Sequence, residues 1–137
     1  MKASTEAAIA ELHPLFGDRL STSSTLCDQH GQGEDSHGCI PPEAVIFVQS
    51  NEEVAKIAKV CQQHKVAIIP YGTGTSVEGH LLALQGGICI NLSQMNRVLS
   101  ISAGDMDCRV QAGVTRKLLN HDLRHQGLFF PVDPGAD

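Results

Sequence analysis

The sequence predicts an α+β domain that begins with an α/β layer, a small and mainly parallel sheet covered by helices. The first observation is an apolar run at 44–48, a segment with helical spacing, and a second apolar run at 66–69. Two buried strands flanking one helix imply parallel strands joined by a right-handed crossover. The second observation is a series of short strand-like runs after residue 88, joined by tight turns. We therefore expect a βαβ unit over 44–70 within a mainly parallel layer over 44–92, followed by the start of an antiparallel layer.

The composition fits one globular domain and excludes several partners. The chain has 137 residues, 42% of them hydrophobic, and a formal net charge of −5. A chain of this length can bury a core without help from disulfides or a metal. The acidic balance and the scattered Lys and Arg residues exclude a nucleic-acid partner, which requires a concentrated basic face. No window approaches the roughly 20 apolar residues of a membrane span, so we expect no transmembrane segment.

Cysteine usage indicates a reducing compartment. The count of five is odd, and Cys61, Cys89 and Cys108 lie in apolar runs, where a thiol packs as a small hydrophobe. The first six residues contain one Lys and an early Glu, so they resemble neither a secretory signal nor an Arg-rich transit peptide. We therefore expect a cytoplasmic protein.

Residues 1–43 are predicted to form an N-terminal helix and arm. Ser4 or Thr5 can cap a helix over 4–16, which Pro14 weakens near its end. Residues 21–43 are rich in Ser, Gly, Asp and His and predict an ordered loop without a regular element.

The central segment has the sharpest pattern of the chain. The β-branched run at 44–48 predicts a strand, after which Ser50 or Asn51 caps a helix with two glutamates in its first turn. The apolar side of that helix has i, i+3, i+4, i+7 spacing and consists of Val54, Ile57, Ala58 and Cys61. The helix closes at Lys65, and the run at 66–69 is the second strand.

The last third of the chain predicts three strands and a helix. The strands are 88–92, 98–101 and 108–111, with turns at 86–87 and 103–105. Thr115 caps a helix that extends to about Gln126 and ends at Gly127. Its inward residues are predicted to be Leu118, Leu119 and Leu123.

A Gly-, Thr- and Ser-rich loop at 70–80 directly follows the second strand. Such a loop presents backbone N–H groups with little obstruction, which is how a nest for phosphate oxygens is built. It is not a dinucleotide fingerprint, because G-x-G-x-x-G needs Gly at the position of Val77. It is not a Walker loop either, because His80 and Leu81 stand where Lys and Ser or Thr are required. A plain surface connection is the alternative interpretation.

Four stretches together carry a family resemblance. They are Pro41-Pro42-Glu43-Ala44-Val45, Pro70-Tyr71-Gly72-Thr73-Gly74-Thr75-Ser76-Val77-Glu78-Gly79-His80, Gly113-Val114-Thr115-Arg116-Lys117-Leu118-Leu119-Asn120 and Phe130-Pro131-Val132-Asp133-Pro134-Gly135-Ala136-Asp137. Their order and spacing resemble the FAD-binding domain of the vanillyl-alcohol-oxidase type, also called the PCMH type. Within that group, the stretches are most similar to the FAD-linked D-lactate dehydrogenase and glycolate oxidase family. On this resemblance, residues 44–137 are the N-terminal part of a PCMH-type domain, with FAD between its two layers.

The resemblance also implies the residues that bind the cofactor. In such proteins the 70–80 loop wraps the FAD pyrophosphate, and the Pro-Val-Asp-Pro-Gly stretch lines the cofactor from the other side. The residues carried over are Tyr71, Gly72, Thr73, Gly74, Thr75, Ser76, Gly79, His80, Asp133, Pro134 and Gly135. Related covalent flavoproteins have a His in this loop where Thr75 stands here, which implies noncovalent FAD. His80 either approaches the cofactor or is an ordinary loop histidine, and His37 is a candidate for covering it.

Other candidate sites are weaker. Two Cys and two His lie close together at Cys27, His30, His37 and Cys39, but their spacing is not typical of zinc sites, so no metal is expected. His121 and His125 have i, i+4 spacing without the Glu of a zincin pattern, and a solvated helix face is the simpler interpretation. No G-x-S-x-G nucleophile elbow occurs in the sequence.

The resemblance implies an oxidoreductase that converts a 2-hydroxy acid such as D-lactate or glycolate to the 2-oxo acid, with hydride transfer to the flavin. Family members are about three times longer than this chain. We therefore expect this chain alone to be inactive, its catalytic residues to lie outside it, and a C-terminal half or partner subunit to complete the enzyme. The alternative is a stand-alone or split flavin-binding or interaction module without activity of its own.

Overall fold

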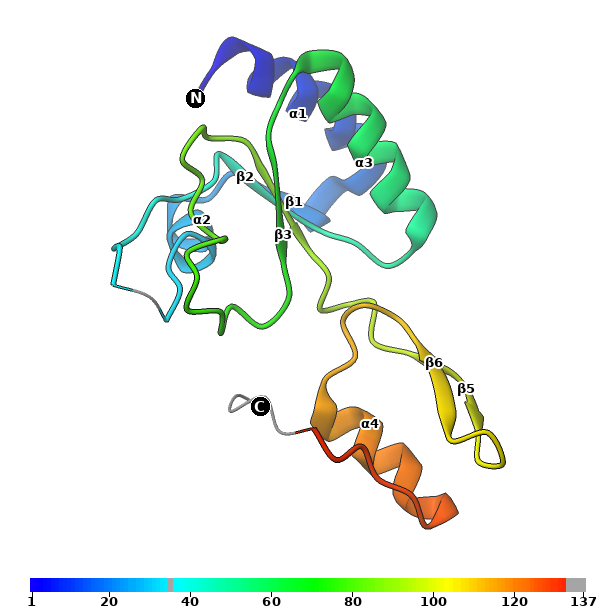
Figure 1. The fold of residues 1–137 in the computed structure, drawn as a ribbon. Helices are drawn as coiled ribbons and strands as arrows, with labels where there is room; N and C mark the ends of the chain where they lie inside the picture. Colours follow the sequence, from blue (N-terminus) through cyan, green and yellow to red (C-terminus); the bar gives the residue numbers. More distant parts are fainter. Residues whose placement is uncertain (35, 133–137) are drawn as a thin grey trace.

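The fold has two parts that meet near the carboxyl ends of the parallel strands of a small sheet (Figure 1). It is seen in a computed structural model that describes residues 1–34 and 36–132. The first part is a four-stranded sheet with helices on both faces. The second part is a two-stranded sheet with one helix beside it, drawn in yellow and orange in Figure 1.

The four-stranded sheet has the order β1-β2-β4-β3. Its strands are β1 (Leu20–Ser21), β2 (Ala44–Phe47), β3 (Ile68–Tyr71) and β4 (Ile88–Asn91). β2 and β3 both pair with β4 in parallel, and only β1 is antiparallel. The predicted βαβ unit is therefore present, with β2 and β3 as parallel strands on either side of a central strand that comes later in the sequence.

Alternation along β2 separates two layers of side chains. Ala44, Ile46 and Val48 are fully buried in the cluster that contains α1 (Ala3–Phe16) and α3 (Asn51–His64). Val45 and Phe47 belong to the opposite cluster with α2 (Ser24–His30). Successive strand residues point to opposite faces, so one strand contributes to both layers. α1 and α3 thus cover one face of the sheet, and α2 covers the other.

The second part follows β4 directly. β5 (Val98–Ser102) and β6 (Asp107–Val110) form an antiparallel pair, as predicted for the start of the second layer. Thr115 accepts a hydrogen bond from the Leu118 N–H at 3.2 Å and caps α4 (Arg116–Leu123), which continues as the 3₁₀ helix η2 (Arg124–Gln126). Leu119 and Leu123 are buried, and Gly127 ends η2 in the left-handed conformation. The predicted helix and both of its ends are confirmed.

The N-terminal region contains the predicted helix over 4–16 but differs from the prediction in its cap and in the segment that follows. Helix α1 begins after Lys2, and Thr5 is not its cap: its hydroxyl donates to the Glu43 carboxylate at 2.7 Å. Pro14 lies inside α1, which ends at Phe16 as predicted. The predicted loop over 21–43 contains a helix, α2, and it is preceded by the 3₁₀ turn η1 (Gly17–Arg19) and the short strand β1.

One cysteine prediction was wrong. Cys61 and Cys89 are fully buried, but Cys108 is exposed because both faces of β6 are open to solvent. An apolar residue in a strand is buried only where another layer covers that face of the sheet. Among the described residues no layer covers either face of β6, so Cys108 stays exposed whereas Cys89 does not.

Candidate cofactor site

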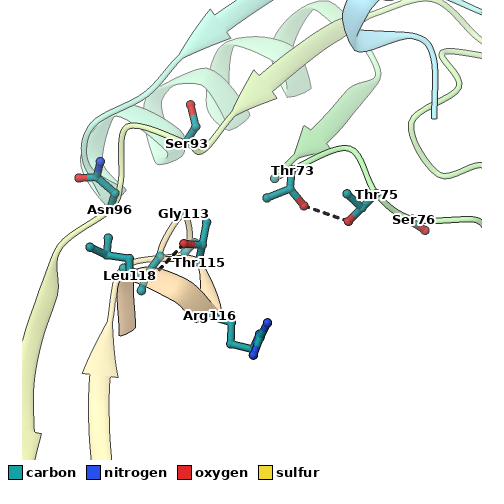
Figure 2. A pocket seen from close by; sticks show the side chains of 12 residues that line it. Thr73, Thr75, Ser76, Ser93, Asn96, Gly113, Thr115, Arg116 and Leu118 are labelled. Atoms are coloured by element: carbon teal, nitrogen blue, oxygen red, sulfur yellow. Dashed lines mark hydrogen bonds between the residues drawn. The ribbon is translucent and has the colours of Figure 1, made fainter. Parts of the chain in front are cut away.

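A cavity of about 600 Å³ lies where the two parts of the fold meet. One wall is the loop that follows β3, and the opposite wall comes from the segment after β4 and the start of α4 (Figure 2). The lining residues are Gly72, Thr73, Thr75, Ser76, Ser93, Asn96, Ala112, Gly113, Val114, Thr115, Arg116 and Leu118.

The first wall is rich in hydroxyl groups. Thr73, Thr75 and Ser76 line it, and the two threonine hydroxyls are 3.0 Å apart, within hydrogen-bond distance. Gly74 has φ +77°, and a Cβ placed on it would collide with the Tyr71 hydroxyl. This position thus requires glycine both for its backbone conformation and for its closeness to a packed ring.

The second wall contains the N-terminus of a helix and a cation. Gly113 makes this approach possible, because a Cβ there would overlap the Leu92 carbonyl oxygen and lie 3.0 Å from that of Met95. Thr115 caps α4, and Arg116 at the first helical position lines the cavity. Helix N-terminal N–H groups and an arginine both favour negative charge, so this wall is electropositive.

The donor set of the cavity matches an anionic diphosphate. Thr73, Thr75 and Ser76 line the cavity opposite a wall that carries Arg116, and among the described lining residues Arg116 alone is charged. Glycine backbone and hydroxyl donors suit phosphate oxygens, and a guanidinium suits their charge. The residues present therefore fit the diphosphate of FAD.

The structure places the predicted residues unevenly around this cavity. Gly72, Thr73, Thr75 and Ser76 line it, while Tyr71 and Gly74 lie directly behind it, in contact with each other. Gly79 lies next to the His37 ring, with a hypothetical Cβ 3.1 Å from its Cδ2 atom. Neither Gly79, His80 nor His37 is among the described lining residues. Asp133, Pro134 and Gly135 lie outside the described residues, so their roles stay predictions.

Sequence reasoning missed the second wall. Arg116 supplies the cation that the glycine-rich loop itself lacks, and Ser93 and Asn96 add polar groups from the segment after β4. Arg116 lies in the stretch 113–120, which carries the family resemblance but was not predicted to contact the cofactor. One signal in the sequence could have indicated this role. Arg116 directly follows the predicted Thr115 cap, and a residue there lies at the end of a helix that attracts anions.

The candidate metal ligands are dispersed. His30 is buried and hydrogen bonded within the first part, whereas Cys39 is exposed and its thiol donates to the Asp28 carbonyl at 3.4 Å. Within residues 1–34 and 36–132, no three His, Cys, Asp or Glu side chains are grouped to hold a metal ion.

Comparison with solved structures defines the fold class. The chain superposes on alkyldihydroxyacetonephosphate synthase with a TM-score of 0.84 and 24% identity, over 94% of this chain and 28% of that one. It also superposes on p-cresol methylhydroxylase with a TM-score of 0.73 and 20% identity, over 93% of this chain and 26% of that one. The fold is that of an FAD-binding domain of the vanillyl-alcohol-oxidase, or PCMH, type.

Sequence comparison gives the family. Residues 42–137 match the FAD binding domain family, and the chain belongs to it. Over 98% of its length, the chain is 46% identical to a probable mitochondrial D-lactate dehydrogenase of Danio rerio. It is 44% identical over 93% of its length to the mitochondrial D-lactate dehydrogenase [cytochrome] of Arabidopsis thaliana. The glycolate oxidase subunit GlcD of Bacillus subtilis is 33% identical over 69% of this chain.

The chain spans only about a quarter of these relatives, namely 27%, 23% and 20% of their lengths. Among the described residues, no helix is both long and apolar enough to cross a membrane. The matched family binds FAD, so FAD is the cofactor of the family to which the chain belongs.

Proposed function

We propose that this chain is the FAD-binding part of an oxidoreductase that oxidises a small 2-hydroxy acid, such as D-lactate or glycolate, to the 2-oxo acid. The observation that carries the proposal is the two-walled cavity, with phosphate-type donors, in a chain of the FAD binding domain family. The choice of substrate class is supported by relatives named D-lactate dehydrogenase and glycolate oxidase.

The residues of this chain bind and orient the cofactor. FAD, when bound, supplies the chemistry by accepting a hydride from the carbon that bears the hydroxyl group. The hydroxyls of Thr73, Thr75 and Ser76 hold the diphosphate from one side, and Arg116 balances its charge from the other. Substrate anchoring and proton transfer belong to residues outside this chain.

The cofactor is held without a covalent bond. Thr75 lines the cavity where the resemblance places a His in covalent relatives, and a threonine hydroxyl forms no such link to flavin. His80 is exposed. Acid precipitation of the flavin-loaded protein should release all flavin into the supernatant, and flavin retained in the pellet contradicts this proposal.

A second candidate function is a flavin-binding module that acts with a separate partner. The two-walled cavity supports it as well, because FAD uptake by this cavity does not depend on how the rest of the enzyme is attached. Both candidates require FAD uptake, and they differ in whether the remaining part is fused to this chain. The cytoplasmic location also stays a prediction, since the Danio rerio and Arabidopsis thaliana relatives are named as mitochondrial proteins.

The test is a titration of the purified chain with FAD, followed by flavin fluorescence and the visible spectrum. We expect saturable binding and a perturbed flavin spectrum. Arg116→Gln should weaken binding about tenfold or more, because a charge-assisted contact contributes roughly 1.5–3 kcal/mol. Arg109→Gln, on the open face of β6, is the matched control and should bind like the unaltered chain. Absence of flavin uptake by the chain, both alone and joined to a C-terminal half, contradicts the proposal.

A further inference from the structure

A buried polar chain of hydrogen bonds leads from α2 to the wall of the cofactor cavity. It starts at His30, the last residue of α2, and the His30 side chain is only 6% exposed. The Nδ1 atom of His30 lies 2.8 Å from the Leu26 carbonyl oxygen, which can only accept. Nδ1 must therefore carry a proton and donate to this carbonyl.

The other ring nitrogen of His30 contacts β4. Its Nε2 atom lies 2.9 Å from the Asn91 amide nitrogen, and Asn91 is 5% exposed. The Asn91 amide oxygen accepts from the Ser93 N–H at 2.8 Å, which fixes the amide with its NH₂ group toward His30. Nε2 therefore accepts, and the ring is neutral. Ser93 itself lines the cavity.

The same imidazole packs against the strand that leads into the other wall. Its ring lies 4.4 Å from the Tyr71 ring, centroid to centroid. Tyr71 ends β3, and its hydroxyl closely approaches Gly74, in the loop whose other residues line the cavity. One buried side chain thus contacts the ends of two neighbouring strands, just before the residues that form the two walls.

We propose that His30 is a positioning residue for the FAD cavity: its neutral ring holds the ends of β3 and β4 in register, and its protonation releases them. Protonation would place an N–H of the ring against the NH₂ of Asn91, so that two donors face each other. The hydrogen bond to β4 is then lost. That the cavity binds FAD rests on the function proposed above, whereas the contacts of His30 with Asn91 and Tyr71 do not depend on that function.

The buried titratable groups around His30 are neutral. The titratable groups of the same cluster are the Tyr71 phenol on β3, the Cys89 thiol on β4 and the Cys27 thiol on α2. Burial raises the pKa of all three, that of Cys89 to about 12, so they are neutral at physiological pH. The Phe47 ring of β2 lies perpendicular to the imidazole, 5.9 Å away between centroids, and Asp28 of α2 is exposed but acts on the Cys27 thiol through its charge.

The first experiment uses NMR spectroscopy of the chain without FAD. We expect the side-chain nitrogen shifts of His30 to show the Nδ1–H tautomer near neutral pH. On acidification, the Ser93 and Gly72 amide signals should titrate together with the His30 ring. A charged or Nε2–H ring at neutral pH, or Ser93 and Gly72 signals that do not follow the ring, overturns the proposal.

The second experiment measures FAD affinity as a function of pH. His30→Phe keeps the ring and removes both hydrogen bonds, so FAD binding should weaken about five- to tenfold and lose its dependence on acid. Asn91→Asp supplies an acceptor for the protonated ring, so the acid-induced loss of affinity should move to a lower pH. His13→Phe, an exposed position on α1, is the control and should change neither property.

The two experiments separate the two proposals. If the chain takes up no FAD but the NMR signals behave as expected, the proposed function fails and the positioning role stands. If FAD binds but His30→Phe and Asn91→Asp retain the affinity and pH profile of the unaltered chain, the positioning role is wrong and the proposed function stands. Far-UV circular dichroism of each variant establishes that it is folded.

Discussion

Gly74 shows how a single residue links the packing of Tyr71 to the loop that lines the candidate cofactor cavity. Its φ of +77° and its contact with the Tyr71 hydroxyl both exclude a side chain. Gly127 has nearly the same conformation, φ +69°, but nothing within 4 Å of a hypothetical Cβ. An alanine at position 127 would thus be destabilised by backbone strain alone, whereas an alanine at position 74 would also collide with Tyr71.

The change Gly74→Ala should weaken FAD binding at least tenfold, because either Tyr71 or the loop over 72–76 must move. The change Gly127→Ala should leave FAD binding unaltered and reduce the free energy of unfolding by only about 1 kcal/mol, the typical cost of strain in the left-handed region. Flavin fluorescence titration and urea unfolding measure the two quantities. Equal FAD affinity in both variants would show that the contact with Tyr71 does not matter for the loop.

Glu43 connects the start of α1 to the start of β4. Burial raises the pKa of its carboxyl group, but hydrogen bonds from the Thr5 hydroxyl and from the Gly87 and Lys2 N–H groups outweigh burial, so the pKa is lowered overall. A group whose pKa is lower in the folded state stabilises that state above its unfolded pKa, about 4.3 for Glu. This contribution is lost as the pH falls through the folded value.

We therefore expect Glu43→Gln to lower the free energy of unfolding by about 1–3 kcal/mol at pH 7. The difference from the unaltered chain should shrink as the pH falls below about 4.3. Urea unfolding between pH 3 and pH 7 measures it, and Glu6→Gln, on an exposed position of α1, is the control. A difference that stays constant over this pH range contradicts the assigned role of the carboxylate.

At the scale of elements, periodic segments were predictable and packed loops were not. Strand β2, helix α3 and the capped helix α4 follow from local patterns, because their apolar residues recur at fixed spacing. Helix α2 does not, because its sequence is polar and its stability comes from burying Cys27 and His30 under the sheet. The mainly parallel layer over 44–92 was predicted and includes β4, but the position of β4 between β2 and β3 was not, since pairing over 40 residues leaves no local signal.

The candidate site divides in the same way. Its glycine-rich wall is one continuous stretch and was predictable, whereas Ser93 and Arg116 reach the cavity only through pairing of β4 and through the close approach of Gly113 to Leu92. No spacing rule connects residues that are 20 to 40 positions apart. Sequence reasoning therefore found one wall of the site and missed the cation on the other.

Two capped helices allow a matched test of the cavity wall. Ser50 caps α3 and Thr115 caps α4, each accepting a hydrogen bond from an N–H three residues on, at 3.3 Å and 3.2 Å. Ser50→Ala and Thr115→Ala should each reduce the free energy of unfolding by about 1 kcal/mol. Only Thr115→Ala should also weaken FAD binding, severalfold, because only Thr115 lines the cofactor cavity. Equal FAD affinity in the two variants would place the diphosphate away from α4.

At the scale of the whole molecule, the cavity is shared between two parts that few elements connect. The segment after β4 leads from one to the other, and the Gly113 and Gln111 N–H groups donate to the Met95 and Arg97 carbonyl oxygens, both at 2.9 Å. A ligand that contacts both walls therefore holds the two parts together. Binding of this kind raises the free energy of unfolding by mass action.

The ligand's diphosphate should account for most of this effect. At a free concentration one hundred times its Kd, FAD should raise the free energy of unfolding by about 2.7 kcal/mol. At that same concentration, riboflavin should change the free energy of unfolding little, because it has no phosphate. ADP should raise it by an intermediate amount, because it has the diphosphate but no flavin. Thermal unfolding in the presence of each ligand measures these three degrees of stabilisation.

The variant Arg116→Gln tests the same assignment from the side of the protein. Because the hydroxyl wall and Arg116 both line the cavity, this variant should lose the stabilisation by ADP and keep part of the stabilisation by FAD. Stabilisation by riboflavin equal to that by FAD would show that the flavin ring, and not the diphosphate, joins the two parts.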